Sequence, residues 1–134
     1  MKILFLGDIV GPSGCMVVKK HLKKIVEENK INFVIANGEN AAHNGVGITK
    51  DVLDNLIKFG VNVLTTGNHV WDHKETLKLV EDDNRLLRPF NLIGISPGKG
   101  FEIYQTSKNL KIGVLNLMGN VFMRKSEDVF KTAE

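Results

Sequence analysis

Short apolar runs alternate with helical patterns through the first part of the chain. Unbroken apolar runs, each followed by glycine or polar residues, predict three buried strands at residues 2–7, 32–36 and 61–66. Apolar residues at helical spacing predict three helices at residues 13–29, 49–59 and about 72–80. A strand-helix alternation of this kind indicates a parallel sheet with right-handed crossovers.

Residues of the capping type support these helix boundaries. Thr49 is the expected N-cap of the second helix, and Gly60 is the expected stop after it. Asp72 and Glu75 have the spacing of a capping box for the third helix. The polar run at residues 82–84 should end that helix.

The pattern changes in the second part of the chain. Two strand-like runs at residues 100–106 and 110–118 flank Ser107-Lys108-Asn109 and predict a β-hairpin. Beyond Gly119 the chain turns polar, and neither a helix nor a strand is predicted up to its end. We therefore expect one α/β domain over residues 1–134, a parallel βαβαβα segment followed by a hairpin whose layer is incomplete.

Composition narrows the class of protein. Hydrophobic residues make up 43% and charged residues 25% of the 134 residues, values typical of a soluble globular protein. The single cysteine, Cys15, cannot form an internal disulfide and favours a reducing, cytoplasmic location. The apolar run at residues 2–7 is too short for an export or membrane segment.

The net charge of +3 points to no particular partner. Four lysines of the first helix could form a nucleic-acid patch or a solvated helix face: Lys19, Lys20, Lys23 and Lys24. Because no aromatic residues interleave with them, stable nucleic-acid binding is not indicated.

Polar residues follow each of the three predicted parallel strands. Asp8 follows the first strand, Glu39 and Asn40 follow the second, and Asn68 and His69 follow the third. Ligands of open parallel sheets bind beyond the carboxyl ends of the strands, so these five side chains should converge at one edge.

The donor types at this edge suggest a metal centre. Carboxylate and amide oxygens with an imidazole nitrogen suit Mn, Fe or Zn. A carboxylate such as Glu39 can bridge two ions, and ions about 3.5–4 Å apart can activate a water for phosphoryl transfer. Taken singly, Asp8 and Asn40 could be turn residues, and Asn68-His69 could cap a helix. Their occurrence after three strands favours a shared site.

The remaining reactive residues have weaker claims. His21 is expected on the surface, His43 either contacts substrate or has no role, and His73 is expected to be structural. Cys15 has no recognisable partner base, which argues against a nucleophile. Trp71 is expected to serve packing.

Three motifs carry a resemblance to a known family. GDIVG at 7–11, NGENAA at 37–42 and GNHVWD at 67–72 resemble the YmdB-like family of metallophosphoesterases, in the calcineurin-like superfamily. Further matches lie at 87–89, 97–100 and 116–119. The resemblance implies an αββα sandwich with a dinuclear metal site and a 2′,3′-cyclic-nucleotide phosphodiesterase. Family members are longer and take further metal-binding histidines from their C-terminal half, so this chain is expected to be the N-terminal half only.

The resemblance also implies a role for each candidate residue. Asp8, Glu39 and Asn40 would contact the first metal ion. Glu39 would bridge to the second ion, which Asn68 would also bind, and His69 would donate a proton to the leaving group. The cofactors implied are two divalent transition-metal ions: Fe, Mn or Zn. No residue is assigned to substrate binding.

The sequence is therefore compatible with two functions of different classes. The first is a metal-dependent phosphoesterase that hydrolyses a small phosphodiester or cyclic nucleotide with a dinuclear-metal-activated water. The alternative is a non-catalytic, truncated domain that binds a nucleotide or partner, with a homo-oligomer covering its unfinished sheet. A doubly wound nucleotide-binding protein is disfavoured, because the first strand is not followed by a Gly-x-Gly-x-x-Gly or Walker pattern.

Overall fold

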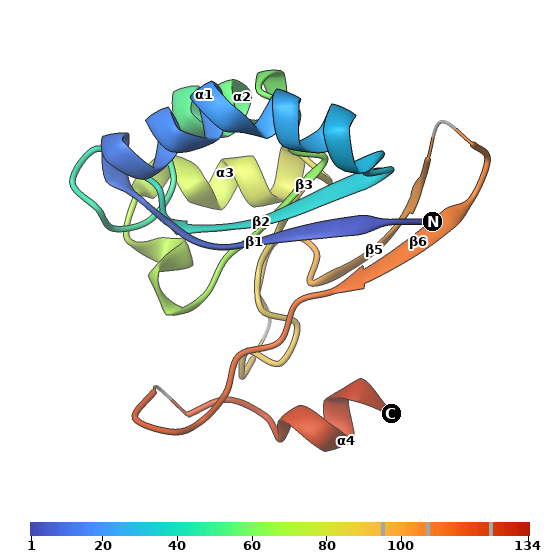
Figure 1. Cartoon of the computed structure of the whole chain (residues 1–134). Helices are drawn as coiled ribbons and strands as arrows, with labels where there is room; N and C mark the ends of the chain where they lie inside the picture. Colours follow the sequence, from blue (N-terminus) through green and yellow to red (C-terminus); the bar gives the residue numbers. More distant parts are fainter. Residues whose placement is uncertain (95, 107, 124) are drawn as a thin grey trace.

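A four-stranded parallel sheet with strand order β1-β2-β3-β4 lies at the centre of the computed structural model, which describes residues 1–94, 96–106, 108–123 and 125–134. Its strands are β1 (Ile3–Val10), β2 (Phe33–Asn40), β3 (Val63–Thr65) and β4 (Leu86–Leu87). The helices α1 (Gly11–Asn29), α2 (Lys50–Lys58) and α3 (Lys74–Asp82) lie over one face of the sheet (Figure 1). The antiparallel hairpin of β5 (Phe101–Gln105) and β6 (Lys111–Leu115) lies on the other face.

The larger hydrophobic core lies between the helices and the sheet. Leu53 and Leu56 of α2 are completely buried there, together with Leu64 of β3. Their helix is strongly amphipathic in sequence, since its apolar residues recur every three or four positions. Burial of this face fixes α2 on the sheet, and the loop that precedes α2 is thereby held at the carboxyl edge.

Replacing Leu56 with alanine should destabilise the fold by about 2–5 kcal/mol, because it removes buried methyl groups and leaves a cavity. Urea unfolding followed by circular dichroism would measure the loss. The exposed neighbour Lys58 is the control, and Lys58→Ala should change stability by no more than about 0.5 kcal/mol. Equal stability of the Leu56→Ala variant and the wild type would contradict this assignment of the core.

A second, smaller core joins the hairpin to the sheet. Ile112 and Val114 of β6 pack against Phe33, Val63 and Leu87 of the parallel strands. The contact between layers is therefore apolar and spans β2, β3 and β4.

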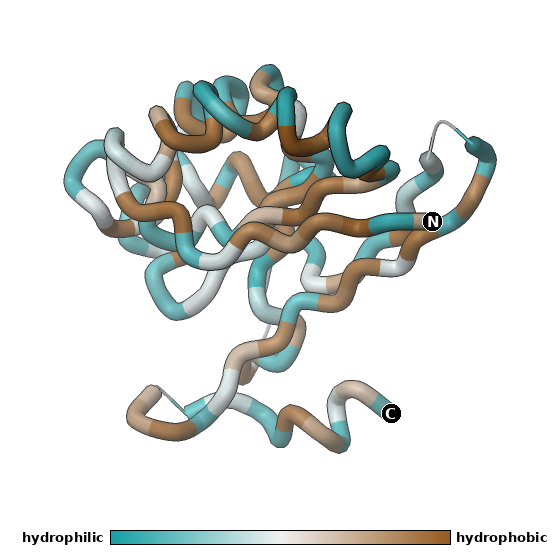
Figure 2. The backbone as a smooth tube through the Cα atoms, in the orientation of Figure 1, coloured by the Kyte–Doolittle hydropathy of each residue, from teal (hydrophilic) through white to brown (hydrophobic). Residues whose placement is uncertain are grey.

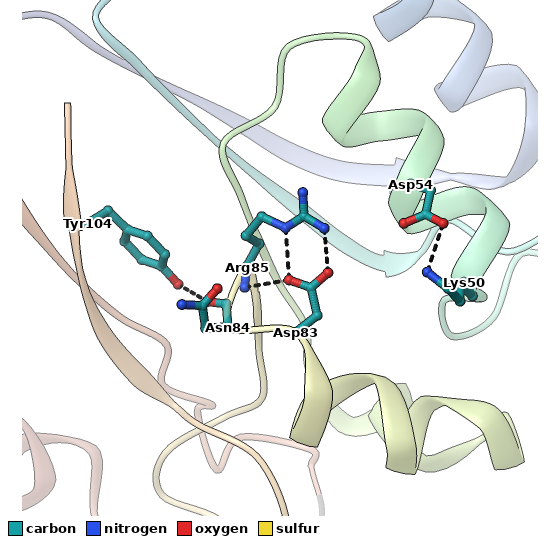
Figure 3. Close-up of polar contacts among 6 residues, drawn as sticks. All are labelled: Lys50, Asp54, Asp83, Asn84, Arg85 and Tyr104. Atoms are coloured by element: carbon teal, nitrogen blue, oxygen red, sulfur yellow. Dashed lines mark hydrogen bonds and ion pairs between the residues drawn. The ribbon is translucent and has the colours of Figure 1, made fainter. Parts of the chain in front are cut away.

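Polar contacts add to this apolar contact between the layers. The buried amide of Asn116 donates to the carbonyl oxygens of Thr66 (2.8 Å) and Leu87 (2.9 Å). The Tyr104 hydroxyl donates to the carbonyl of Asn84, and burial raises the pKa of Tyr104 (Figure 3).

Figure 3 also shows the ion pairs at the end of α3 and in α2. Arg85 donates to Asp83 from Nε (2.9 Å) and Nη2 (2.6 Å), and these bonds lower the pKa of the Asp83 carboxyl. Lys50 and Asp54 form a separate exposed pair at 2.9 Å. Neither pair joins the hairpin to the sheet, and an exposed pair such as Lys50 with Asp54 contributes little to stability.

The hairpin leaves part of the parallel sheet uncovered. Ile3 and Phe5 of β1 pair in register with Phe33 and Ile35 of β2, so they lie on the sheet face that the hairpin covers elsewhere. Ile3 is 46% exposed and Phe5 is 59% exposed, because the hairpin does not reach β1. Figure 2 shows part of this strand in hydrophobic colours, and β1 is itself an edge strand of the sheet.

The predicted fold class is confirmed: the chain is α/β, with a parallel sheet followed by a hairpin. Helix, sheet and hairpin follow the order of the first three layers of an αββα sandwich. The hairpin turn was predicted at residues 107–109, and Ser107 lies outside the described residues. In the part of the chain that is described, no helix has the length and apolar character needed to cross a membrane.

Three local predictions were wrong. The strand β4 was missed because two residues give no readable period. The helix α4 (Val129–Ala133) lies in the supposedly unstructured end, where the Asp128 side chain accepts bonds from the backbone N–H groups of Phe130 and Lys131. Asp72 forms no capping box, since α3 begins after His73 without a side-chain cap.

Candidate functional site

The first two strands of the chain, β1 and β2, run further than their apolar residues suggest. Asp8 lies inside β1, and Glu39 and Asn40 lie inside β2, whereas the sequence placed all three just beyond strand ends. The pairing of β1 with β2 shifts register on both sides of Asp8. Irregularities of this kind redirect side chains and are common beside active sites. Here the shift sets Asp8 opposite Asn37 and brings Asn40 opposite Val10.

Asp8 and Asn40 are in direct contact across this irregular pairing. The Asn40 amide nitrogen donates to both oxygens of the Asp8 carboxylate, at 3.2 and 3.0 Å. Asn37 uses its side-chain oxygen to accept from the backbone N–H of Glu39 at 3.0 Å, a turn-like contact that shapes the strand end. The carboxylate and the amide of adjacent strands are therefore held side by side at the carboxyl edge.

The Glu39 carboxylate lies against the segment that follows β3. Its Oε1 accepts from the backbone N–H of His69 at 3.3 Å. A Cβ atom at Gly67 would lie 2.0 Å from Glu39 Oε2, a distance that real side chains do not adopt. Gly67 has φ of −142°, so the reason for glycine here is space and not backbone conformation. This glycine makes room for the Glu39 carboxylate.

Replacing Gly67 with alanine should displace Glu39 and destabilise the fold by about 1–3 kcal/mol, the usual cost of overpacking. Thermal unfolding would show the stability loss, and divalent-metal titration would show a loss of affinity. Gly119 offers a matched control, because a Cβ there would meet no atom within 4 Å. If Gly67→Ala and Gly119→Ala behaved alike, the close packing of Glu39 on Gly67 would be refuted.

Asn68 and His69 belong to the 3₁₀ helix η1 (Asn68–Trp71). Both are partly exposed, while Val70 is buried and the partly buried Trp71 packs against the main core. Trp71 therefore serves packing, as expected. The burial of these two apolar residues fixes η1, whose His69 backbone N–H contacts Glu39.

His69 has a close carboxylate partner. Its Nδ1 lies 2.6 Å from Oδ2 of Asp72, three residues further along. Both side chains are more than one third exposed, so solvent and ligands can reach the pair. This contact uses the carboxylate that the sequence had suggested for a capping box.

His73 holds the loop between β2 and α2 against η1. Because the carbonyl of Val46 can only accept, the 2.8 Å contact means that His73 donates from Nε2. A Cβ at Gly47 would lie 2.6 Å from the His73 ring and 3.3 Å from the His69 carbonyl oxygen. The positive φ of 74° at Gly47 favours glycine as well. His73 is thus a structural residue, as the sequence suggested.

The other reactive side chains lie away from these contacts. His21 is exposed on α1. His43 is exposed and pairs with Asp51 at 3.6 Å. The Cys15 thiol donates to the carbonyl of Ala41 at 3.6 Å, and burial raises its pKa. A raised pKa lowers the thiolate fraction, which agrees with the view that Cys15 is not a nucleophile.

A cavity of about 610 Å³ lies in the helix layer, between α1 and α2. Its lining includes Pro12, Cys15, Met16, Asp51, Val52 and Phe59. None of the five candidate residues lines this cavity, so the cavity and the candidate site are at different places.

The donor set matches part of a metal centre. Asp8 and Glu39 offer carboxylate oxygens, and Asn40 and Asn68 offer amide oxygens. Among the described residues, no group of three or more His, Cys, Asp or Glu side chains is arranged to hold a metal ion. Gly67 makes room for the Glu39 carboxylate, and Asp8 and Asn40 form a separate contact at the ends of β1 and β2.

An α/β fold with acidic and amide side chains gathered at the carboxyl edge of a parallel sheet defines a class of proteins that bind ligands at that edge. The particular family follows from sequence comparison. The chain belongs to the YmdB-like protein family, whose model matches residues 4–134.

Relatives with known names or structures agree with this assignment. The chain is 40% identical to a 2′,3′-cyclic-nucleotide 2′-phosphodiesterase of Bacillus subtilis, over 100% of this chain and 50% of the relative. A crystal structure of a hypothetical protein from Thermus thermophilus superposes with a TM-score of 0.90 and 36% identity, covering 99% of this chain and 51% of that one. A crystal structure of a novel phosphatase from Mycoplasma pneumoniae gives 0.89 and 32%, covering 99% and 49%. The chain thus spans about half the length of the relatives it matches.

Proposed function

We propose that this chain provides one wall of the active site of a metal-dependent phosphoesterase. The contact of Asp8 with Asn40, next to a Glu39 carboxylate packed on Gly67, is the observation that carries the proposal. The name of the Bacillus subtilis relative supports phosphodiesters, and 2′,3′-cyclic nucleotides among them, as the substrate class. We also propose that the protein is cytoplasmic and that it self-associates.

Asp8, Glu39, Asn40 and Asn68 would hold the metal ions. Their oxygen donors would suit divalent Mn, Fe or Zn, and the Glu39 carboxylate would contact both ions. Bound ions of this kind supply positive charge to the phosphate and activate a water for attack on phosphorus.

His69 would act as the proton donor. Its Nδ1 is occupied by Asp72, so the other ring nitrogen, Nε2, is the atom that can meet a substrate. A proton given from Nε2 to the oxygen that leaves phosphorus avoids the release of a strongly basic alkoxide.

The test uses a fusion protein, in which this chain is joined to the half of the Bacillus subtilis relative that it does not match. The fusion should hydrolyse 2′,3′-cyclic AMP only when a divalent metal is supplied. Asp8→Asn and Glu39→Gln should each abolish most turnover, whereas Asp82→Asn, an exposed change on α3, should have little effect. Binding of the nucleotide without turnover would favour the non-catalytic alternative. Turnover unchanged by Asp8→Asn and Glu39→Gln would refute the proposed site.

A further inference from the structure

The ionisable side chains of Asp72 and His69 contact each other at a partly exposed site. The distance of 2.6 Å between Nδ1 and Oδ2 is that of a strong charge-assisted hydrogen bond. The backbone supports it, because the N–H of Asp72 donates to the carbonyl of His69 at 3.2 Å and closes the turn. The side chains three residues apart are thereby brought to the same side of η1.

The two partners define the state of the imidazole. A carboxylate can only accept, so the proton in this contact belongs to Nδ1 of His69. The neutral ring therefore carries its hydrogen on Nδ1 and leaves Nε2 free of any protein partner in the contacts of the described residues. An orienting partner on one ring nitrogen is the general way in which proteins fix the direction of a working histidine.

The pair is built on an anchored segment. Val70 is buried, and Trp71 packs against the main core on the way from His69 to Asp72. The backbone N–H of His69 is in turn bonded to Glu39. The imidazole, its carboxylate partner and a proposed metal ligand are consequently fixed relative to one another before any substrate binds.

We propose that Asp72 is a positioning residue, which holds His69 with Nδ1 on the carboxylate and Nε2 toward the oxygen leaving phosphorus. This inference rests on the proposed function. In this step His69 starts as the doubly protonated imidazolium; when the phosphorus–oxygen bond breaks, its Nε2 proton passes to the leaving oxygen, and the ring is left neutral with its other proton on Nδ1, against Asp72. Asp72 itself exchanges no proton.

The first test is made on the 134-residue chain without metal or substrate. Nitrogen NMR of ¹⁵N-histidine-labelled protein, at a pH where the rings are neutral, reports which nitrogen carries the hydrogen. We expect His69 in the Nδ1–H form. His73 serves as an internal reference, because it donates from Nε2 to Val46 and should show the Nε2–H form in the same spectrum.

Variants make this test specific. Asp72→Asn and Asp72→Ala should move His69 toward the Nε2–H form, whereas Asp82→Asn, an exposed aspartate of α3, should leave it unchanged. Either of two results would overturn the proposal: an Nε2–H His69 in the wild-type chain, or an unchanged His69 spectrum in both folded Asp72 variants. The wild-type spectrum decides even if a variant does not fold.

The second test separates positioning from a merely structural role. In the fusion protein, Asp72→Asn should lower turnover of 2′,3′-cyclic AMP by roughly 10–100-fold, the range that orienting partners of working imidazoles contribute. Turnover of bis(4-nitrophenyl) phosphate should fall far less, since 4-nitrophenolate leaves without protonation. An equal loss on both substrates would show that Asp72 only supports the fold. A fusion protein without any turnover would count against the proposed function, while the NMR result would still judge the pairing.

Discussion

Replacing His69 with alanine in the fusion protein should lower turnover of 2′,3′-cyclic AMP by about 10²–10⁴-fold, the usual contribution of a general acid. The reason is the fixed position of the ring. Asp72 contacts its Nδ1, and the backbone N–H of His69 donates to the Glu39 carboxylate. Metal content should stay at the wild-type level, because His69 is not among the proposed ligands.

Steady-state kinetics and metal analysis of the same preparation would check both parts. His21→Ala is the matched control, since His21 is exposed on α1. That change should leave turnover within about twofold of the wild type, as expected for a surface substitution. Near-normal rates of His69→Ala on 2′,3′-cyclic AMP would exclude the acid role. Rates on bis(4-nitrophenyl) phosphate would not be decisive, because its leaving group needs no proton.

Much of the fold could be predicted because burial and periodicity act locally. The alternation of apolar runs with helical patterns gave α1, α2 and α3 and the three longer parallel strands within a few residues. The hairpin followed from two strand-like runs around a short polar turn. The strand β4 was not predicted, because its two residues form a strand by pairing with Leu64 and Thr65 and show no pattern of their own.

The candidate residues could be found from sequence, but their geometry could not. Strand ends were placed before Asp8 and Glu39, since polar residues usually mark the end of an apolar run. In the structure the strands continue through them with a shifted register, and this shift depends on the pairing partner. The space that Gly67 leaves for Glu39 is likewise a contact between residues far apart in sequence.

The contact of Asp72 with His69 was not predicted, because a local sequence pattern favoured another role for Asp72. Asp72 and Glu75 have capping-box spacing, which favoured a helix start at Asp72. The residues from Asn68 to Trp71 instead form a 3₁₀ turn, and α3 starts only at Lys74. In that turn His69 and Asp72 come onto one side. A sequence signal did exist, because an aspartate three residues after a histidine can pair with it in any helical turn.

The 134-residue chain alone should bind less than one equivalent of divalent metal and show almost no phosphodiesterase turnover. Its proposed ligands are two carboxylates and two amides, and neutral amide oxygens are weak donors compared with imidazole. Few contacts hold these donors, since within the described residues the Asp8 carboxylate is bonded only by Asn40 and the Glu39 carboxylate only by the η1 backbone. Metal analysis after gel filtration would measure the stoichiometry, and Glu39→Gln should remove the bound fraction.

The same preparation should self-associate, because β1 is an open edge with Ile3 and Phe5 exposed on its uncovered face. Sedimentation velocity at several concentrations would show this, and Phe5→Ser should reduce association without changing metal content. The fusion protein, in which the second half can cover this face, should be less prone to associate. Two tightly bound equivalents of metal with sustained turnover, in the unfused chain, would show that the donors at Asp8, Glu39, Asn40 and Asn68 are sufficient by themselves. A concentration-independent monomer would show that the exposed face of β1 needs no cover.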